Sequence, residues 1–382
     1  MALGTRTTYT DTTPQVRSLR NIIDHIDWTE AGLLKKFGTD NQGKFRLINW
    51  PHTKYEWLSD TMSPRSTTLT EDLDNSETGV DVTDGTIFKE GDVVRVGTEL
   101  MYVSDVTGNT LTVVRGFAGS TAAVASNGAT IYRSTIARLE GADYDTGHTT
   151  TVSSDYNYTQ IFAEAVKVTG SEQVDTKYGI TDTMAYHLSK LMGGSNGYGD
   201  KFRAGSLPLL LQQTFYYGKR AQGSASTARA MGGFEHYVTT NVVDLSSAAL
   251  TRKKIEDLFE TCFLAGGDPD TIIVNSWLRR KISSFYEGSI RTERSETRGG
   301  SKIDTIVTDF GEIEVMFDRW CPTDRLYMVN SADVGWLTYR PWQVVDRPST
   351  GDYMVKEVLG EFGFVVVNQG GMGYIKNAST TA

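Results

Sequence analysis

Residues 97–114 read GTELMYVSDVTGNTLTVV, and this stretch decides the fold of the most self-contained segment of the chain. Its β-branched and aromatic runs favour strands, and the Gly108-Asn109 pair between them tolerates the positive φ of a tight hairpin turn. Similar short runs lie at residues 80–82, 93–96 and 130–132, each next to a glycine-bearing turn. Several short strands of this kind predict a small all-β barrel or sandwich over residues 79–133.

Extended chain flanks this predicted barrel on both sides. Residues 44–62 alternate aromatic and polar side chains, among them Trp50, Tyr55 and Trp57, which suits strands with one apolar face. Residues 134–169 return to the same polar and extended character. We therefore expect the strand that leaves before the barrel to come back after it.

Helical periodicity marks other parts of the chain. Apolar residues spaced by three and four in residues 19–37 predict a helix within a polar, Thr-rich arm. Residues 180–191 and 207–218 carry the stripes of two further helices, or of one helix that the glycine-rich loop at 193–199 interrupts. From about residue 240 onward helices alternate with strands, which predicts an α+β arrangement with a mixed sheet.

The composition is that of a folded, acidic chain. The 382 residues include 38 basic and 47 acidic side chains, a net charge of −9, with 39% hydrophobic and 22% charged residues. This balance argues against a protein that coats nucleic acid through its phosphates. The apolar runs are far shorter than the roughly 20 residues that cross a bilayer, so no membrane span is expected.

One stretch gathers positive charge. Residues 279–302 hold seven Lys and Arg side chains, including Arg291, Arg294 and Arg298, which three glutamates dilute. This stretch is either an exposed, solvated face or a surface that meets the acidic surface of a neighbouring copy.

Motifs for catalysis and cofactors are weak. Residues 193–197 read GGSNG and match G-x-S-x-G, but the apolar strand that must precede a nucleophile elbow is replaced by a helical pattern, so Ser195 is not expected to act as a nucleophile. There is no phosphate-binding G-x-x-x-x-G-K-[ST], and the five histidines are scattered without metal-ligand spacing. We expect no enzyme activity, no cofactor and no metal.

Several strings in a fixed order resemble one known family. GTELMYV at 97–103, TGNTLTV at 107–113 and GSTAA at 119–123 are similar to a β-rich module of tailed-phage structural proteins. YEWLSDT at 55–61, NYTQIF at 157–162, GGDPD at 266–270 and TDFG at 308–311 resemble the major capsid (major head) protein family of the podophage SU-ten type. That family has the Hong Kong 97-type capsid fold, and the resemblance spans residues 40–375.

The resemblance implies a division of the chain into functional parts. The expected parts are an N-terminal arm (1–43), the strands of an extended loop (44–78 and 134–170), an inserted β-barrel subdomain (79–133), a peripheral domain with an interrupted spine helix (171–234 and 346–382) and an axial domain (235–345). We expect Trp50, Tyr55 and Trp57, together with the three arginines above, to contact neighbouring subunits.

The resemblance also implies partners and a location. It implies self-assembly into hexamers and pentamers of an icosahedral or prolate head, with a portal protein, a separate scaffolding protein and a possible decoration protein. The head would enclose double-stranded DNA without sequence-specific binding, and would assemble in the host cytoplasm as part of the virion. The alternatives are an encapsulin-like compartment, which differs in its contents, and a tail or carbohydrate-binding β protein, which would not form particles.

Overall fold

The structure of the chain is a computed structural model that describes residues 31–37, 52–60, 63–138, 140–141, 152–178, 180–194, 203–285, 305–308 and 311–380. The chain divides into two compact units. Unit 1 comprises Met1–Trp57 and Asp155–Ala382, and unit 2 comprises Leu58–Ser154. Unit 2 is therefore an insertion within the sequence of unit 1.

Unit 2 is built on a six-stranded antiparallel sheet. The strand order is β2 (Ser66–Thr68), β7 (Thr130–Ile136), β4 (Asp92–Val96), β5 (Glu99–Thr107), β6 (Thr110–Val114) and β3 (Gly79–Asp81). A bridge between Leu69 and Val82 joins the ends of the two outer strands. Because β2 lies before residue 79, the sheet is wider than the range of 79–133 expected from sequence.

Alternation along these strands creates the core of unit 2. Strand β5 buries every second residue of its first half, and Met101 and Val103 are fully enclosed. The β5–β6 hairpin turns at Gly108, whose φ of 64° is left-handed, while Asn109 accepts a hydrogen bond from the Gly85 amide at 3.1 Å. Of the two turn residues, Gly108 alone takes the positive φ.

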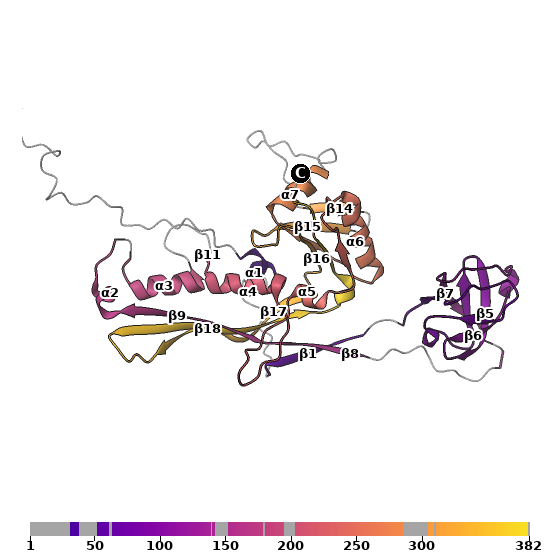
Figure 1. Ribbon diagram of the computed structural model, residues 1–382, viewed down its shortest axis with the longest axis horizontal. Helices are drawn as coiled ribbons and strands as arrows, with labels where there is room; N and C mark the ends of the chain where they lie inside the picture. The colour runs from indigo at the N-terminus through magenta and orange to yellow at the C-terminus, as the bar shows by residue number, and fades with distance from the viewer. Residues whose placement is uncertain are drawn as a thin grey trace, which may run out of the picture. The chain divides into compact units, whose positions relative to one another are not determined.

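A long three-stranded antiparallel sheet forms one layer of unit 1 (Figure 1). Its order is β17 (Val334–Arg347), β18 (Tyr353–Val366) and β9 (Gln160–Thr169). Helices α3 (Thr183–Met192) and α4 (Ser206–Tyr217) run along this sheet, and α2 (Gly170–Val174) follows β9. The sheet thus carries a helical layer on one face.

Helices α3 and α4 are followed and preceded, respectively, by two short strands that pair with each other. These strands are β10 (Gly193–Gly194) and β11 (Arg203–Ala204), and their pairing is antiparallel. Gly205 then lies so close to α3 that a Cβ there would stand 2.1 Å from the Leu191 carbonyl oxygen. The two helices consequently lie end to end in Figure 1, as one interrupted helix.

A second, six-stranded mixed sheet completes unit 1. Its order is β12 (Val242–Asp244), β19 (Gly373–Lys376), β16 (Leu326–Val329), β13 (Thr271–Val274), β15 (Gly311–Phe317) and β14 (Thr305–Thr308). Helices α6 (Arg252–Leu264) and α7 (Ser276–Phe285) pack on it. Strand β19 belongs to this sheet, although its residues were expected in the peripheral part of the chain.

An aromatic core joins the two sheets of unit 1. Phe215 of α4 lies within 6.4 Å, centroid to centroid, of several rings, which belong to Phe37, Tyr216, Phe234, Tyr327 and Phe364. Phe37 comes from the short helix α1 (Gly32–Phe37), and Phe234 from α5 (Phe234–Tyr237). Helix α1 is therefore part of the core. Within the described residues, no helix has the length and apolar character needed to span a membrane.

Candidate functional site

A two-stranded ribbon leads from unit 1 toward the insertion. It consists of β1 (Lys54–Ser59) and β8 (Ser153–Tyr158). The side chain of Tyr55 at its base is only 2% exposed. Its hydroxyl donates to the Phe364 carbonyl and accepts from the Phe364 amide, both at 2.6 Å, and burial raises its pKa well above the usual range. These two hydrogen bonds attach β1 to β18.

Asn157 performs the same task for the second strand of the ribbon. Its Nδ2 donates to the carbonyls of Gly232 at 3.0 Å and Phe364 at 2.7 Å, and its Oδ1 accepts from the Gly232 amide at 2.9 Å. The residue is fully buried, and both ends of its amide are satisfied. A buried amide with all partners in place fixes one geometry, because each alternative leaves a polar group unpaired.

Two cations lie over the ring of Tyr156, the residue before Asn157. The Lys54 ammonium lies 4.3 Å and the Arg220 guanidinium 3.9 Å from its ring centroid. Its carbonyl accepts from Arg220 Nη1 at 2.7 Å and from the Tyr237 hydroxyl at 2.9 Å. Trp57 packs edge-on against Tyr237 with ring centroids 5.4 Å apart. Several side chains of unit 1 therefore hold the first residues of the ribbon in place.

Glu361 of β18 is the centre of an ionic cluster next to Thr159, the residue that follows β8. Its carboxylate is 1% exposed and accepts from Arg229, from Arg340 Nε at 2.9 Å and from the Thr159 hydroxyl. Arg229 also donates to the Thr159 carbonyl at 3.0 Å. Removing one partner from this cluster would leave the Glu361 carboxylate buried without the opposite charge that compensates for its lost hydration.

Two further polar junctions tie α4 and α5 to the mixed sheet. The Asp318 carboxylate accepts from Gln212 Nε2 at 2.8 Å and from the Tyr216 hydroxyl, and burial raises the pKa of Tyr216. Glu235 accepts from Arg325 and from the Tyr327 hydroxyl at 2.5 Å. These contacts hold the helical layer and the mixed sheet of unit 1 in one arrangement.

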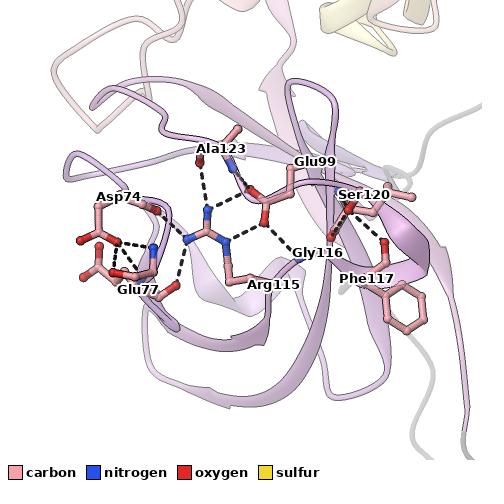
Figure 2. Close-up of polar contacts among 10 residues, drawn as sticks. Asp74, Glu77, Glu99, Arg115, Gly116, Phe117, Ser120 and Ala123 are labelled. Carbon is pink, nitrogen blue, oxygen red and sulfur yellow. Dashed lines mark hydrogen bonds and ion pairs between the residues drawn. The ribbon is translucent and has the colours of Figure 1, made fainter.

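Unit 2 contains a buried ion pair between Arg115 and Glu99, shown in Figure 2. Arg115 Nε donates to Glu99 Oε1 at 2.7 Å, and Nη2 donates to Glu99 Oε2 at 2.8 Å and to the Ala123 carbonyl at 2.9 Å. Nη1 donates to the main-chain carbonyls of Asp74 at 2.6 Å and Glu77 at 2.9 Å. All five N–H donors of the guanidinium are thus used.

The Glu99 carboxylate is equally well satisfied. Besides Arg115, it accepts from the amides of Gly116 at 3.2 Å and Ala123 at 3.0 Å. Burial alone would raise the pKa of Glu99, but the hydrogen bonds from Arg115 and these two amides outweigh it and hold the pKa below its ordinary value. The Arg115–Glu99 ion pair and its hydrogen bonds connect β5 and the end of β6 with the β2–β3 loop.

The residues expected to contact neighbours lie in different places. Trp50, Arg291, Arg294 and Arg298 fall outside the described residues, as does Ser195. Trp57 is half-buried against the core of unit 1. Tyr55 is buried within its own chain, so it presents no surface to a neighbour; alternation identified its strand but not which face the core covers.

Sequence reasoning missed Asn157, Glu361, Glu99 and Arg115. In the sequence, Asn157, Glu361 and Glu99 are polar residues within strands and Arg115 follows one, and nothing distinguishes them from the polar residues at exposed strand positions. In the described part of the chain no group of three or more His, Cys, Asp or Glu side chains could hold a metal ion. The contacts described above hold helices, strands and loops in place within each unit.

Residues 5–194 and 203–379 match a family described as SU10 major capsid protein. No curated protein matches the chain.

Solved structures with the same fold share little sequence with the chain. The cyanophage A-1(L) capsid asymmetric unit is 10% identical with a TM-score of 0.56, covering 98% of this chain and 100% of that one. A structure of Mycobacterium phage Bobi is 9% identical with a TM-score of 0.50, covering 97% and 98%. A structure of the SrpI encapsulin complex from Synechococcus elongatus is 9% identical with a TM-score of 0.39, covering 60% of this chain and 78% of that one.

Proposed function

Because the chain belongs to the SU10 major capsid protein family, we propose that it forms the hexamers and pentamers of an icosahedral or prolate phage head around double-stranded DNA. The chain is a structural capsid protein of a tailed-phage virion that associates with copies of itself, and it is not an enzyme. The predicted α+β fold of the Hong Kong 97 type is confirmed by the matching phage structures.

We assign roles to the parts of the chain within this proposal. Residues 1–43 act as an N-terminal arm whose helix α1 packs into the core of unit 1, and the ribbon β1–β8 with its flanking chain acts as the extended loop. Unit 2 is an insertion in that loop. The three-stranded sheet with α3 and α4 acts as the peripheral domain, and the six-stranded mixed sheet acts as the axial domain.

The observation that best supports this assignment is the root of the ribbon. Tyr55 and Asn157, one on each strand, both bind the carbonyl of Phe364. A loop that reaches a neighbouring subunit transmits its position only if its root is rigid. The buried, fully paired root of β1–β8 meets that requirement.

Contacts between subunits are part of the proposal. Trp50, Trp57 and the cationic residues Arg291, Arg294 and Arg298 remain our candidate contact residues, since aromatic and arginine side chains dominate such interfaces. Tyr55 is reassigned from a contact residue to a positioning residue, because it is buried inside its own subunit.

Further partners belong to the same proposal. A portal protein, a separate scaffolding protein and a decoration protein would complete the head, which would assemble in the host cytoplasm. The chain would enclose DNA without reading its sequence, since its acidic composition does not favour tight phosphate contacts.

Electron microscopy of the expressed chain, alone and with its scaffolding and portal partners, tests the proposal. We expect closed shells built from hexamers and pentamers. Monomers or small soluble oligomers under every assembly condition would contradict it.

A further inference from the structure

His236 of α5 lies beside the groups that hold β8 to unit 1. A Cβ added at Gly232 would stand 2.8 Å from His236 Cδ2 and 3.2 Å from Cγ, so the imidazole packs directly against Gly232. The Gly232 carbonyl accepts from Asn157 Nδ2 at 3.0 Å, and its amide donates to Asn157 Oδ1 at 2.9 Å. The histidine therefore contacts the residue that fixes the Asn157 side chain.

The imidazole also contacts Tyr237, which holds the residue before Asn157. The His236 and Tyr237 rings meet edge to face, with their centroids 5.0 Å apart. The Tyr237 hydroxyl donates to the Tyr156 carbonyl at 2.9 Å, and the Tyr237 ring packs against Trp57 of β1. One half-buried side chain thus touches the partners of two successive residues of β8.

The charges that act on His236 are mainly positive. Arg220 follows α4 and lies 5.9 Å from the centroid of the Tyr237 ring, and Lys219 precedes it in the chain. Asp155 of β8 is the opposing carboxylate, but it already pairs with Arg220 Nη1 at 3.1 Å and accepts from the Tyr156 amide at 2.8 Å. A proton on the imidazole would therefore add a cation to a site in which the carboxylate is already used.

The other charged groups nearby are paired elsewhere. Glu235, the preceding residue of α5, accepts from Arg325 and from the Tyr327 hydroxyl. Lys54 of β1 lies over the Tyr156 ring and pairs with Glu56. Among the residues that the structure describes, the imidazole has no hydrogen-bond acceptor for a second N–H. The contacts of His236 consequently suit its neutral form.

Folding therefore disfavours the protonated imidazole. Loss of hydration, and then the charges of Arg220 and Lys219, lower the pKa of His236 below its ordinary value, against the opposing effect of Asp155. Because the folded pKa lies below the unfolded value of about 6.5, the stabilisation by neutral His236 is complete above that pH. It is lost as the pH falls from there through the folded pKa.

We propose that His236 is a pH-sensitive switch for the attachment of the β1–β8 ribbon to unit 1. In its neutral form it packs on Gly232 and Tyr237 and leaves the hydrogen bonds of Tyr156 and Asn157 intact. Protonation places a second cation beside Arg220, and the repulsion loosens residues 155–158. All groups of the switch belong to one chain, so it does not depend on the proposed shell.

Hydrogen exchange followed by mass spectrometry on the full-length chain tests the switch. After correction for the intrinsic pH dependence of exchange, we expect protection of peptides containing residues 155–158 to fall about five- to tenfold between about pH 7.5 and about pH 5. Carboxylates with ordinary pKa values of about 4 stay ionised over this range, so a histidine is the group that titrates. Peptides of the core strand β5 in unit 2 provide the internal reference.

Two variants of His236 hold the site in one charge state. His236→Gln keeps a neutral polar side chain, and its protection should stay at the high value at both ends of the pH range. His236→Lys introduces a permanent cation and should show the lowered protection at both ends. His187→Gln is the matched control, because His187 of α3 also meets a neighbouring tyrosine edge-on, with centroids 5.4 Å apart. It should respond to pH like the wild type.

The comparison of the wild type with His236→Gln decides the outcome. A pH response that disappears in His236→Gln and persists in His187→Gln supports the switch. No response in the wild type, or the same response in His236→Gln, overturns it. Circular dichroism at the higher pH establishes that each variant is folded, and the decisive pair remains informative if His236→Lys does not fold. Failure of the chain to form shells would contradict the proposed function and leave this result unaffected.

Discussion

At the scale of single residues, the Glu99–Arg115 pair determines the stability of unit 2. Replacing Arg115 with Met leaves the buried Glu99 carboxylate without its cation, and we expect a loss of about 3–5 kcal/mol in the unfolding free energy of unit 2. Denaturant unfolding followed by a probe in unit 2 measures this loss. Arg95→Met, which removes an exposed arginine from the same sheet, is the matched control and should cost less than about 1 kcal/mol.

The same pair predicts a pH dependence. The folded pKa of Glu99 lies below its unfolded value of about 4.3, so the stabilisation is complete above that pH. It is lost as the pH falls through the folded pKa. Carboxylates of this kind titrate between about pH 5 and about pH 3. Over that range the unfolding free energy of the Glu99→Gln variant should therefore decline less steeply than that of the wild type. Equal slopes would show that Glu99 is not the titrating group.

The ribbon root makes a second prediction at this scale. Asn157→Ala leaves the carbonyl and amide of Gly232 without their buried partner, which should destabilise unit 1 by about 2–4 kcal/mol. We expect shells of this variant to be irregular even where the subunit still folds. Asn127→Ala, at an exposed position, serves as the control. Regular shells with unchanged stability would mean that the root is not needed for the fold of unit 1 or for assembly.

At the scale of elements, the interruption of the long helix depends on one glycine. A Cβ at Gly205 would stand 2.1 Å from the Leu191 carbonyl and 2.5 Å from the Gly193 amide, both backbone atoms that cannot move aside. Gly205→Ala should therefore lower the melting temperature of the subunit by several degrees, on the order expected for 1–3 kcal/mol. Gly335→Ala in β17 has nothing within 4 Å of the added atom and should have little effect. The two variants melting alike would contradict the close junction of α3 and α4.

Helices and strands whose apolar residues follow a regular pattern were predictable from sequence. The apolar stripe of residues 255, 258, 259 and 262 indicated α6, and the continuous run at 271–274 indicated the central strand β13, because burial on one or both faces leaves a readable pattern. Strand β2 was missed, since its three residues Ser-Thr-Thr carry no apolar signal and pair only because β7 lies beside them. Tyr55 was found as a strand aromatic, but its burial depends on Phe364, which lies 309 residues away in the chain.

At the scale of the whole molecule, the insertion has a core of its own. The buried cluster that includes Leu69, Met101 and Ile131 is separate from the two clusters of unit 1. Because β2 pairs with β7, the boundary for removing the insertion lies at residues 60 and 152 rather than within residues 79–133. This boundary could not be read from composition, since the sequence is polar on both sides of it.

Joining residues 60 and 152 by a short glycine-serine linker should leave a folded subunit. We expect its far-ultraviolet spectrum and melting to match the contribution of unit 1, and its shells to be weaker or misassembled, because the contacts of unit 2 are gone. Size-exclusion chromatography and microscopy measure the two effects separately. Shells of wild-type yield and stability would show that unit 2 makes no contact needed for assembly.

The central claim is that this chain builds a closed phage head. Cryo-electron microscopy of particles formed by the full-length wild-type chain tests it most directly. We predict hexamers and pentamers in which the β1–β8 ribbon of each subunit reaches its neighbour and keeps the root at Tyr55 and Asn157 described above. Chains that never form closed particles, or particles in which the ribbon contacts no other subunit, would contradict the account.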